Sequence, residues 1–434
     1  MGLYIQLHSM HGLFRGHDLE LGRDEDTGGQ IVYVLELAKA LGSLDGVDKV
    51  EIITRRIIDP EYPGYDEKIE KVTDNVSIVR IECGPRKYLK KVDLWPYLDE
   101  FIENTKRYIK RVPDVFQSNY ADSGQVCARL AKHYKRPQVH TGHSLGIPKM
   151  QRLGVNKSNK ARYKAYHFDK RIKAEQEAID NAAAIVASTT EEIRQQYSGY
   201  DTVEGKFRCI PPGIDLKKFH PPKKETPVFG LLDNIRKQHL RYPDRKMISV
   251  LSRMDRRKNI TGLLEAFASI KDKANLLIFA NTLSYGGESQ PVIDEFNRIM
   301  RKHSLYGHVA IPGISLDYAT QVPEYYRYLA SKGGIFVNPA LIEPFGLTVV
   351  EASACGVPVV ATNNGGPTEI ITDKKDGLLI NPKDKKDMAA KMKTLCRDKR
   401  LWKRISDNGI KNARKNFSWK KAARRYLKVF KEVI

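Results

Sequence analysis

Cysteine is scarce in this sequence, and the few residues present are scattered. They are Cys83, Cys127, Cys209, Cys355 and Cys396, an odd number with no Cys-x-x-Cys spacing. A disulfide framework uses an even set of cysteines, and a structural zinc site uses closely spaced ligands. The sequence therefore predicts no disulfide framework and no metal site, and it favours a reducing, cytoplasmic location.

Long apolar runs and low-complexity tracts are also missing. No apolar run approaches the length of a membrane span, and the start, MGLYIQLHSMHG, lacks the basic region and cleavage site of a signal peptide. The residues are 41% hydrophobic and 9% aromatic, which is typical of a folded globular protein. We therefore expect no membrane partner.

Acidic residues are too few to balance the basic ones. The chain has 74 lysines and arginines against 52 acidic residues, which gives a formal net charge of +22. Much of the excess lies after residue 383, where apolar residues recur every three or four positions. That pattern favours a solvated helix face, and no motif of a nucleic-acid-binding module accompanies it. We expect no nucleic-acid partner, and keep a non-catalytic, basic nucleic-acid-binding protein as the alternative of another class.

Short apolar strands alternate with helical patterns in two series. The first series is expected at residues 3–9, 50–55, 77–83, 114–119, 137–144 and 183–189. The second is expected at residues 247–253, 275–281, 308–313, 333–340, 357–362 and 377–382. Alternation of this kind predicts parallel sheets covered by helices on both faces. The fold class is therefore α/β, with two doubly wound, Rossmann-like domains that face a cleft.

The domain boundary is expected where the alternation stops. Prolines and lysines interrupt it in CIPPGIDLKKFHPPKKETP, as they would in a linker. We assign residues 1–215 to an N-terminal domain, 216–245 to a linker region and 246–416 to a C-terminal domain. Residues 417–434 read as one amphipathic helix. Ligands are expected at the carboxyl ends of the strands, in the cleft.

One carboxylate stands in a segment that is otherwise apolar. Glu351 lies within GLTVVEASACGV, and a buried carboxylate without a partner is too costly to keep. The helix begins near Gly346, and free amides at a helix start bind anions. A phosphate would fit there while Glu351 accepts hydrogen bonds from a sugar. Glu343 precedes the helix, where an acid also stabilises the helix dipole; we favour a ligand contact.

A basic loop follows the first strand of the second series. In LSRMDRRKN, the strand ends at Arg253, and Lys258 closes the loop. Arg256 and Arg257 fit a solvated turn. Arg253 and Lys258 bracket the loop at the edge of the expected cleft, where a diphosphate would need positive charge.

Two segments of the N-terminal domain are also candidates. Residues 10–27 form a connection far longer than a usual strand–helix loop, and Gly28 and Gly29 let a ligand approach the backbone closely. The glycines do not form the GxGxxG fingerprint, which disfavours a nicotinamide enzyme. In HTGHSLGIPKM, His143, Ser144 and Lys149 suit a cleft. His140 fits a core position, since no third metal ligand accompanies the two histidines.

Together these segments resemble the retaining glycosyltransferases of family 4 with the GT-B fold, and among them the sucrose-phosphate synthases. The resemblance is carried by HGLFRGHDLELGRDEDTGGQ, LWPYL, GHSLG with the lysine that follows, IPPGID, SRMDRRKN and NPALIEPFGLTVVEASACGVPVVATNNGGP. The first and the last of these are highly specific. The resemblance implies that the final helix crosses back onto the N-terminal domain, which would bind the acceptor, while the C-terminal domain would bind the nucleotide sugar.

The resemblance also implies site residues. The catalytic group would be His143, Glu343, Arg253 and Lys258. The donor would be bound by Gly29, Arg253, Lys258, Gly346, Leu347, Thr348 and Glu351. The acceptor would be bound by Gly28, Gln30, Lys91, Tyr120, Ser144, Lys149, Lys170 and Arg171. The family usually has two consecutive arginines where this chain has Lys170 and Arg171, and a lysine lacks the bidentate fork.

The implied reaction transfers glucose from UDP-glucose to fructose 6-phosphate with retention, which gives sucrose 6-phosphate. UDP-glucose is a substrate, no cofactor is required, and a separate phosphatase would act on the product. No pair of carboxylates suited to double displacement is evident, so we expect front-face substitution. The same fold also serves mannosylfructose-phosphate synthase, which uses GDP-mannose, and sucrose synthase, which uses free fructose; both stay open as alternatives.

Overall fold

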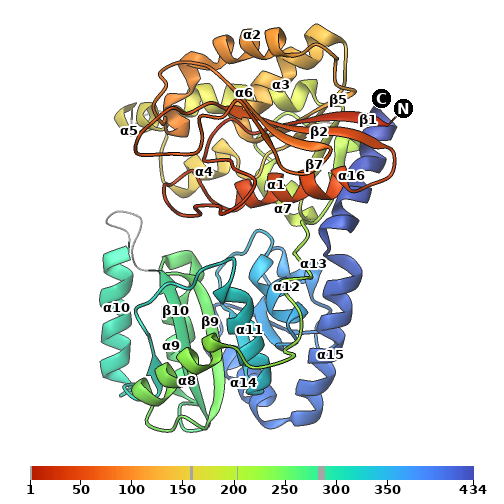
Figure 1. The fold of residues 1–434 in the computed structure, drawn as a ribbon. Helices are drawn as coiled ribbons and strands as arrows, with labels where there is room; N and C mark the ends of the chain where they lie inside the picture. Colours follow the sequence, from red (N-terminus) through yellow and green to blue (C-terminus); the bar gives the residue numbers. More distant parts are fainter. Residues whose placement is uncertain (1, 157–159, 203, 282–288) are drawn as a thin grey trace. The chain divides into compact units, whose positions relative to one another are not determined.

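The computed structural model describes residues 2–156, 160–202, 204–281 and 289–434. The chain forms two compact units (Figure 1). The first unit comprises Met1–Pro212 and Trp419–Ile434, and the second comprises Gly213–Ser418. The segment 216–245 contains helix α8 (Pro227–His239) and lies within the second unit.

The first unit is built on an eight-stranded sheet. Its order is β3-β4-β2-β1-β5-β6-β7-β8, and every neighbouring pair is parallel except β3 with β4. The order reverses at β1, which lies between β2 and β5, so this is a doubly wound sheet with its switch point there. The strands are β1 (Leu3–His8), β2 (Val47–Arg55), β3 (Ile69–Lys71), β4 (Val76–Ile81), β5 (Val115–Asn119), β6 (Gln138–Thr141), β7 (Ala184–Ala187) and β8 (Phe207–Cys209).

Helices cover both faces of this sheet. One apolar cluster joins Ile5 and Leu7 of β1 to the inner sides of α1 and α16, and a second joins Phe116 of β5 to α2 and α3. The α-helices are α1 (Gly29–Gly42), α2 (Leu98–Tyr108), α3 (Tyr120–Tyr134), α4 (Gly146–Arg152), α5 (Lys160–Ala165), α6 (Phe168–Asn181), α7 (Thr190–Gln196) and α16 (Trp419–Val433). Short 3-10 turns occur at η1 (Lys91–Asp93), η2 (Trp95–Tyr97) and η3 (Glu204–Lys206).

The last helix, α16, completes the first unit. It lies beside α1 (Figure 1) and buries Val429 and Phe430 in the same apolar cluster. The buried hydroxyl of Tyr426 is 2.7 Å from that of Tyr33 and 3.0 Å from Oγ1 of Thr141. These bonds pair buried hydroxyl groups that would otherwise lack a hydrogen-bond partner in the core. Helix α16 is therefore held to α1 and β6 by both apolar and polar contacts.

The second unit is built on a six-stranded, all-parallel sheet. Its order is β11-β10-β9-β12-β13-β14, with the reversal at β9. The strands are β9 (Lys246–Arg253), β10 (Ala274–Asn281), β11 (Val309–Ala310), β12 (Ile335–Asn338), β13 (Val359–Thr362) and β14 (Leu378–Ile380). The helices are α8, α9 (Ile260–Ala268), α10 (Ser289–Lys302), α11 (Gln321–Ser331), α12 (Leu347–Ala354), α13 (Pro367–Ile370), α14 (Lys385–Arg397) and α15 (Lys399–Asn416), with the turn η4 (Arg256–Lys258).

Two apolar clusters form on the opposite faces of this second sheet. One includes side chains of α8, α11 and α12, and the other includes side chains of α9, α10 and α14. Each of the twelve predicted strands overlaps a strand of the structure, and parallel sheets covered on both faces are confirmed. The short strands β3 and β8 were not predicted.

We predict that Tyr426→Phe destabilises the first unit. The substitution removes the hydroxyl that joins Tyr33 to Thr141 and leaves those two groups buried without it. The expected loss is about 1–3 kcal/mol, read as a lower urea midpoint or melting temperature. Tyr306→Phe is the matched control, because the Tyr306 side chain is exposed and its change should leave the midpoint unaltered. Equal midpoints for Tyr426→Phe and wild type would contradict this role.

Candidate functional site

The loop before α12 is held by a glycine-rich turn after β13. Gly346 caps α12 with φ 104°, a left-handed conformation that favours glycine. The amide of Gly366 donates to the carbonyl oxygen of Glu343 at 2.8 Å, and the amide of Glu343 donates to Asn364 at 3.1 Å. A Cβ on Gly365 would lie 2.2 Å from the Glu343 carbonyl oxygen, so only glycine permits this contact. The sequence NNGGP thus fixes the position of Glu343 and of the helix start.

Glu343 forms an ion pair with Lys258. The Lys258 ammonium lies 2.7 Å from Oε2 of Glu343, and Nδ2 of Asn338 donates to the same oxygen at 3.1 Å. Lys258 ends η4, the turn that follows β9, and Asn338 ends β12, so a turn and a strand end converge on one carboxylate. The structure therefore brings together two of the residues predicted from separate motifs.

Arg253 lies at the end of β9 and is half exposed. Its guanidinium is 3.4 Å from Oδ2 of Asp255, whose other oxygen accepts the amides of Arg257 at 3.0 Å and Lys258 at 3.1 Å. Asp255 thus caps η4 and orients the loop between the two predicted phosphate-binding cations. No direct contact between Arg253 and Glu343 is found.

Glu351 is buried in the middle of α12, and its hydrogen-bond partners are tyrosines. The Tyr318 hydroxyl donates to Oε1 at 2.6 Å, and the Tyr326 hydroxyl is 3.4 Å from Oε2. Burial raises the pKa of Glu351 to about 7, and the tyrosine hydrogen bonds oppose that rise. The carboxylate is therefore partnered within its own unit, which the apolar segment alone did not indicate.

In the first unit, Arg171 is a buried cation with partners on three other residues. Its Nε donates to Glu175 at 2.9 Å, its terminal nitrogen donates to the Ser144 carbonyl oxygen at 2.7 Å, and its guanidinium carbon is 4.6 Å from the Tyr120 ring centre. Glu175 also accepts the amide of Gly146 through both oxygens. Arg171 on α6 is thereby tied to the start of α4 and to Tyr120, which has φ 73°.

Two lysines lie near Arg171 but differ in their partners. Lys91 is ion-paired with buried Asp26, which also accepts the Lys91 amide at 2.7 Å. Lys149 has no ion pair with a described residue, and its ammonium lies 5.1 Å from the Tyr166 ring centre. Burial, followed by the positive charges of Arg171 and Lys91, lowers the pKa of Lys149 to about 8. Of the three cations, Lys149 is the one without an ion pair to a described carboxylate, although the more distant Asp26 opposes the lowering of its pKa.

His143 follows β6 and is held in one tautomer. Its Nε2 is 2.9 Å from Oδ1 of Asn119, whose Nδ2 donates to the carbonyl oxygen of His8 at 3.2 Å and to Gln117 at 2.8 Å. Because the amide orientation is fixed, Nε2 of His143 carries the proton and Nδ1 is the acceptor. Burial, with smaller effects of His140 and His11, lowers the pKa of His143 to about 3, so the ring is neutral.

The remaining predicted residues of the first unit differ in their surroundings. A Cβ on Gly28 or Gly29 would meet no atom within 4 Å, so the backbone at the start of α1 borders open space. Gln30 donates to Ser9 Oγ at 2.9 Å. Lys170 is exposed on the turn of α6 that carries Arg171, and it has no hydrogen bond or ion pair with the described residues.

His140 is buried, as predicted for a core position. Its Nδ1 is 2.9 Å from Ser118 Oγ, whereas its Nε2 has no partner within the described chain. Burial lowers its pKa to about 4, so this ring is also neutral. No group of three potential metal ligands occurs among residues 2–156, 160–202, 204–281 and 289–434.

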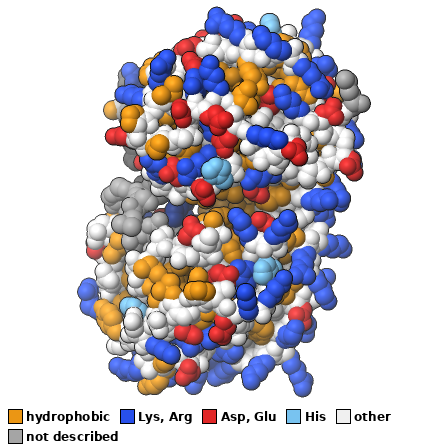
Figure 2. Space-filling view, viewed as in Figure 1, with side chains coloured by type: hydrophobic (Ala, Val, Ile, Leu, Met, Phe, Trp, Pro, Cys, Tyr) orange, Lys and Arg blue, Asp and Glu red, His pale blue; other side chains and the backbone are white. Residues whose placement is uncertain are grey.

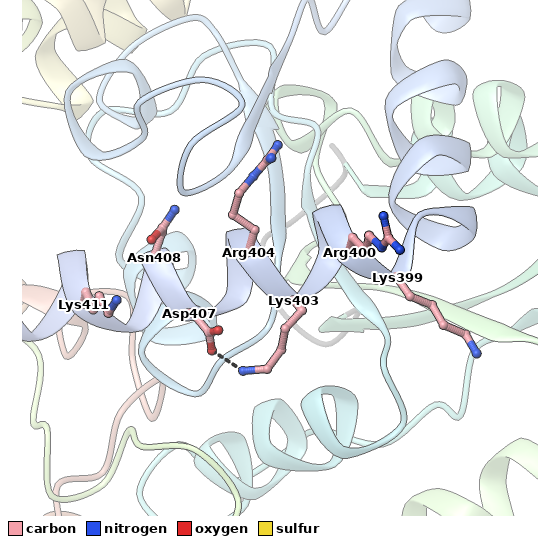
Figure 3. Close-up of a pocket in the computed structure, with 7 residues that line it drawn as sticks. All are labelled: Lys399, Arg400, Lys403, Arg404, Asp407, Asn408 and Lys411. Carbon is pink, nitrogen blue, oxygen red and sulfur yellow. Dashed lines mark hydrogen bonds and ion pairs between the residues drawn. The ribbon is translucent and has the colours of Figure 1, made fainter.

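The basic excess does not gather at these sites. Figure 2 shows lysine and arginine side chains spread over the visible face, with acidic side chains between them. One hollow of about 550 Å³ lies along α15 and is lined by Lys399, Arg400, Lys403, Arg404, Asp407, Asn408 and Lys411. In Figure 3, Lys403 reaches toward Asp407 on the same helix, and Arg404 projects away from this pair. The hollow is lined by a single polar helix face without aromatic side chains.

Two family models match consecutive parts of the chain. The model described as sucrose synthase first GT-B domain matches residues 2–206, and the model described as glycosyl transferases group 1 matches residues 233–412. A solved sucrose-phosphate synthase from Thermosynechococcus elongatus has a TM-score of 0.74 and 25% identity, with 99% of this chain and 98% of that chain covered. The chain has the GT-B glycosyltransferase fold.

In sequence, the chain is similar along nearly its whole length to part of the sucrose-phosphate synthases. Probable sucrose-phosphate synthase 1 of Oryza sativa subsp. indica is 36% identical over 504 residues, which cover 98% of this chain and 46% of the relative. Sucrose-phosphate synthase 4 of Arabidopsis thaliana is 36% identical over 500 residues, which cover 98% and 47%. The chain thus spans about half the length of the curated relatives it matches.

The GT-B fold is also shared with more distant proteins. Anabaena HepE, solved in complex with UDP and glucose, has a TM-score of 0.68 at 16% identity. In the described part of this GT-B chain, no helix combines the length and apolar character that a membrane crossing requires.

Sequence reasoning missed the residues that hold the predicted ones in place. They are Asp26, Glu175, Asp255, Tyr318 and Asn338. Asp255 had a local signal, since an aspartate two or three residues before a turn's amides is a typical cap. The others contact residues remote in sequence, except Glu175, which pairs with Arg171 four positions earlier on α6.

We predict that Glu351→Gln removes a pH-dependent destabilisation of the second unit. The folded-state pKa of about 7 exceeds the ordinary 4.5, so the folded state holds a proton that the unfolded state releases. Wild-type stability should therefore fall between about pH 4.5 and 7, by about 3 kcal/mol in total. The Glu351→Gln variant lacks this fall. Its melting temperature, relative to that of wild type, should therefore increase from pH 5 to pH 8.

Glu225→Gln is the control for this measurement, because Glu225 is exposed on the same unit. Its melting temperature should follow wild type at every pH. A constant difference between Glu351→Gln and wild type from pH 5 to 8 would contradict the raised pKa.

Proposed function

We propose that this protein transfers glucose from UDP-glucose to the 2-hydroxyl of fructose 6-phosphate, with retention at the anomeric carbon. The relatives named sucrose-phosphate synthase, similar along 98% of the chain, support this reaction. The observation that carries the proposal is the group of three cations formed by Lys91, Lys149 and Arg171. A free sugar has no charge that would require them, whereas a sugar phosphate does.

The acceptor phosphate is assigned to Lys149. Lys91 and Arg171 each already have a carboxylate, in Asp26 and Glu175, so they supply fixed positive charge with little net cost of burial. Lys149 supplies the charge that the protein leaves uncompensated. A phosphate dianion would restore the balance and hold the Lys149 ammonium protonated. Gly28, Gln30, Tyr120 and Ser144 would contact the sugar.

The donor is assigned to the second unit. Glu351 would hold the ribose, Arg253 and Lys258 the diphosphate, and the free amides at the start of α12 would add hydrogen bonds to the phosphate. Glu343 would contact the transferred sugar. Its ion pair with Lys258 favours this assignment, because the pair places an acceptor and a donor of hydrogen bonds side by side. Gly29 would approach the donor through its backbone.

The chemistry that these residues support is a front-face substitution. As the bond to the diphosphate breaks, negative charge gathers on the leaving group and the sugar becomes oxocarbenium-like. Arg253, Lys258 and the α12 amides would stabilise that charge, and such stabilisers are worth roughly 10²–10³ in kcat each. Neutral His143 cannot supply a proton at neutral pH, but its Nδ1 can accept a hydrogen bond from the sugar's 6-hydroxyl.

The surrounding biology is part of the same proposal. The product, sucrose 6-phosphate, would be substrate for a separate phosphatase, and the reaction would take place in the cytoplasm. The scattered cysteines, none of them in a disulfide within the described chain, support this location.

A panel assay tests the function. The purified protein is offered UDP-glucose, ADP-glucose, GDP-glucose and GDP-mannose, each with fructose or fructose 6-phosphate, and both nucleotide release and product identity are measured. Sucrose 6-phosphate from UDP-glucose is the expected product. Product from free fructose would favour sucrose synthase, and mannosylfructose phosphate would favour the GDP-mannose enzyme. Salt-sensitive binding of generic DNA or RNA, with no turnover, would favour the non-catalytic alternative.

We predict that Lys149→Met raises the acceptor KM and spares donor hydrolysis. Loss of a charged contact of about 1.5–3 kcal/mol corresponds to roughly 10–100-fold. In wild type, the ammonium is lost as pH rises through about 8, so the acceptor KM should rise above that pH. This rise should be absent in Lys149→Met, because no titrating amine remains.

Lys132→Met is the matched control for this prediction. It removes an equal charge from an exposed position of the same unit that is assigned to no binding role, and the acceptor KM should change less than threefold. Equal effects of the two substitutions would assign the contribution to general positive charge and contradict a specific role of Lys149.

A further inference from the structure

Glu351 is buried, yet one of its two hydrogen-bond partners is itself exposed. Glu351 is 2% exposed, and Tyr326, one of its two partners, is 0% exposed. Tyr318, the other partner, is 37% exposed and makes the shorter hydrogen bond, 2.6 Å to Oε1. Of the two hydroxyls on the carboxylate, only that of Tyr318 belongs to a side chain that reaches solvent.

The backbone that carries Tyr318 is firmly built. Oδ1 of Asp317 accepts the amide of Thr320 at 2.8 Å and its hydroxyl at 2.6 Å. The carbonyl oxygen of Asp317 accepts the amide of Gln321 at 2.9 Å, and the Gln321 side chain accepts the Asp317 amide at 2.9 Å. Tyr318 therefore projects from a fixed turn ahead of α11, and its ring packs 6.2 Å from that of Phe219. Rotation about its side-chain torsions can move the phenol without breaking the turn.

We propose that Tyr318 is a removable cover on Glu351 that must be displaced when a nucleotide binds. This inference rests on the proposed function, in which Glu351 holds the ribose. The ribose hydroxyls would take the place of the phenol on Oε1, while Tyr326 stays on Oε2. Tyr318 is thus a positioning residue that keeps the carboxylate partnered when no nucleotide is bound, and part of the binding energy is spent on releasing it.

Two physical constraints favour a cover over a permanent support. A ligand cannot reach a carboxylate that is 2% exposed unless a neighbouring group moves, and Tyr318 is the hydrogen-bond partner whose side chain is partly exposed. A buried carboxylate without a hydrogen bond is costly, so the empty site needs a substitute for the ribose. A phenol meets that need and can leave, because its hydroxyl is satisfied equally well by water.

The test compares nucleotide affinity in wild type and Tyr318→Phe by calorimetry, with UDP as the probe and ADP and GDP in parallel. The variant lacks the Tyr318 hydroxyl that must leave Oε1 of Glu351 before the ribose binds there. A single hydrogen bond contributes about 0.5–1.5 kcal/mol net, so we expect UDP to bind roughly 3–10-fold more tightly. The unliganded variant should melt at a lower temperature than wild type, and saturating UDP should raise its melting temperature by more.

Two further variants separate this role from general packing. Tyr326→Phe is the matched control, because it removes the longer bond on the other oxygen, and it should leave UDP affinity within twofold of wild type. In a Glu351→Gln background, Tyr318→Phe should no longer tighten UDP binding, since the carboxylate on which it acts is gone. This non-additivity is the signature of two residues that act together.

The outcomes are distinct. Unchanged or weaker UDP binding by Tyr318→Phe would overturn the cover and leave the proposed function standing. Tyr318→Ala, which removes the ring as well, is a second test. This variant should also bind UDP more tightly than wild type, and weaker binding would contradict the inference. Failure of the wild-type protein to bind UDP, ADP or GDP would contradict the proposed function itself, and with it the inference.

Discussion

The cost of taking charge out of water constrains both units of this protein. The candidate sites contain several buried charged side chains. They are Arg171 and Glu175 on α6, Glu343 before α12 and Glu351 within α12. Each of them is buried, and each has a partner of opposite charge or a hydroxyl. These partners fix the side chains in place, so the pairing that makes burial tolerable also sets the geometry of the candidate sites.

The same constraint explains which groups are left for a ligand. In the first unit, Asp26 and Glu175 neutralise Lys91 and Arg171, and Lys149 keeps an unbalanced charge. In the second unit, Lys258 neutralises Glu343, and Arg253 interacts with Asp255 at the half-exposed end of β9. A phosphate would therefore meet one uncompensated lysine in the first unit and a partly screened arginine in the second. Ligand charge is expected where the protein's own pairing is incomplete.

Sequence periodicity was sufficient to predict the central strands of both sheets but not the short edge strands of the first sheet. The central strands could be predicted because parallel strands buried on both faces read as continuous apolar runs. Strand β3 (Ile69–Lys71) is a three-residue antiparallel edge with exposed and half-exposed side chains, so it has no such signal. Helix α8 was hidden because the prolines and lysines before it suggested a linker, although Pro227 occupies the first turn, where proline is favoured.

The candidate site was predictable only in part, for a related reason. Glu343, Glu351, Arg253 and Lys258 stand out locally, since each is a charge beside an apolar segment. Their partners are distant in sequence: Tyr318 is 33 positions from Glu351, and Lys258 is 85 positions from Glu343. Periodicity carries no information on such pairs. These partners are therefore visible only in the folded structure.

Glu343 and Glu351 illustrate how one loop and one helix give two carboxylates different properties. Glu343 lies beside Lys258 and forms an ion pair with it. Glu351 has only hydroxyls, which compensate burial incompletely, and its pKa of about 7 leaves it partly protonated at neutral pH. A ribose offers two hydroxyl donors, and only the carboxylate form accepts both. Ribose binding would therefore lower the pKa of Glu351, just as a phosphate would raise that of Lys149. In each unit, the proposed ligand would therefore favour the charged form of one side chain, which is Lys149 in the first unit and Glu351 in the second.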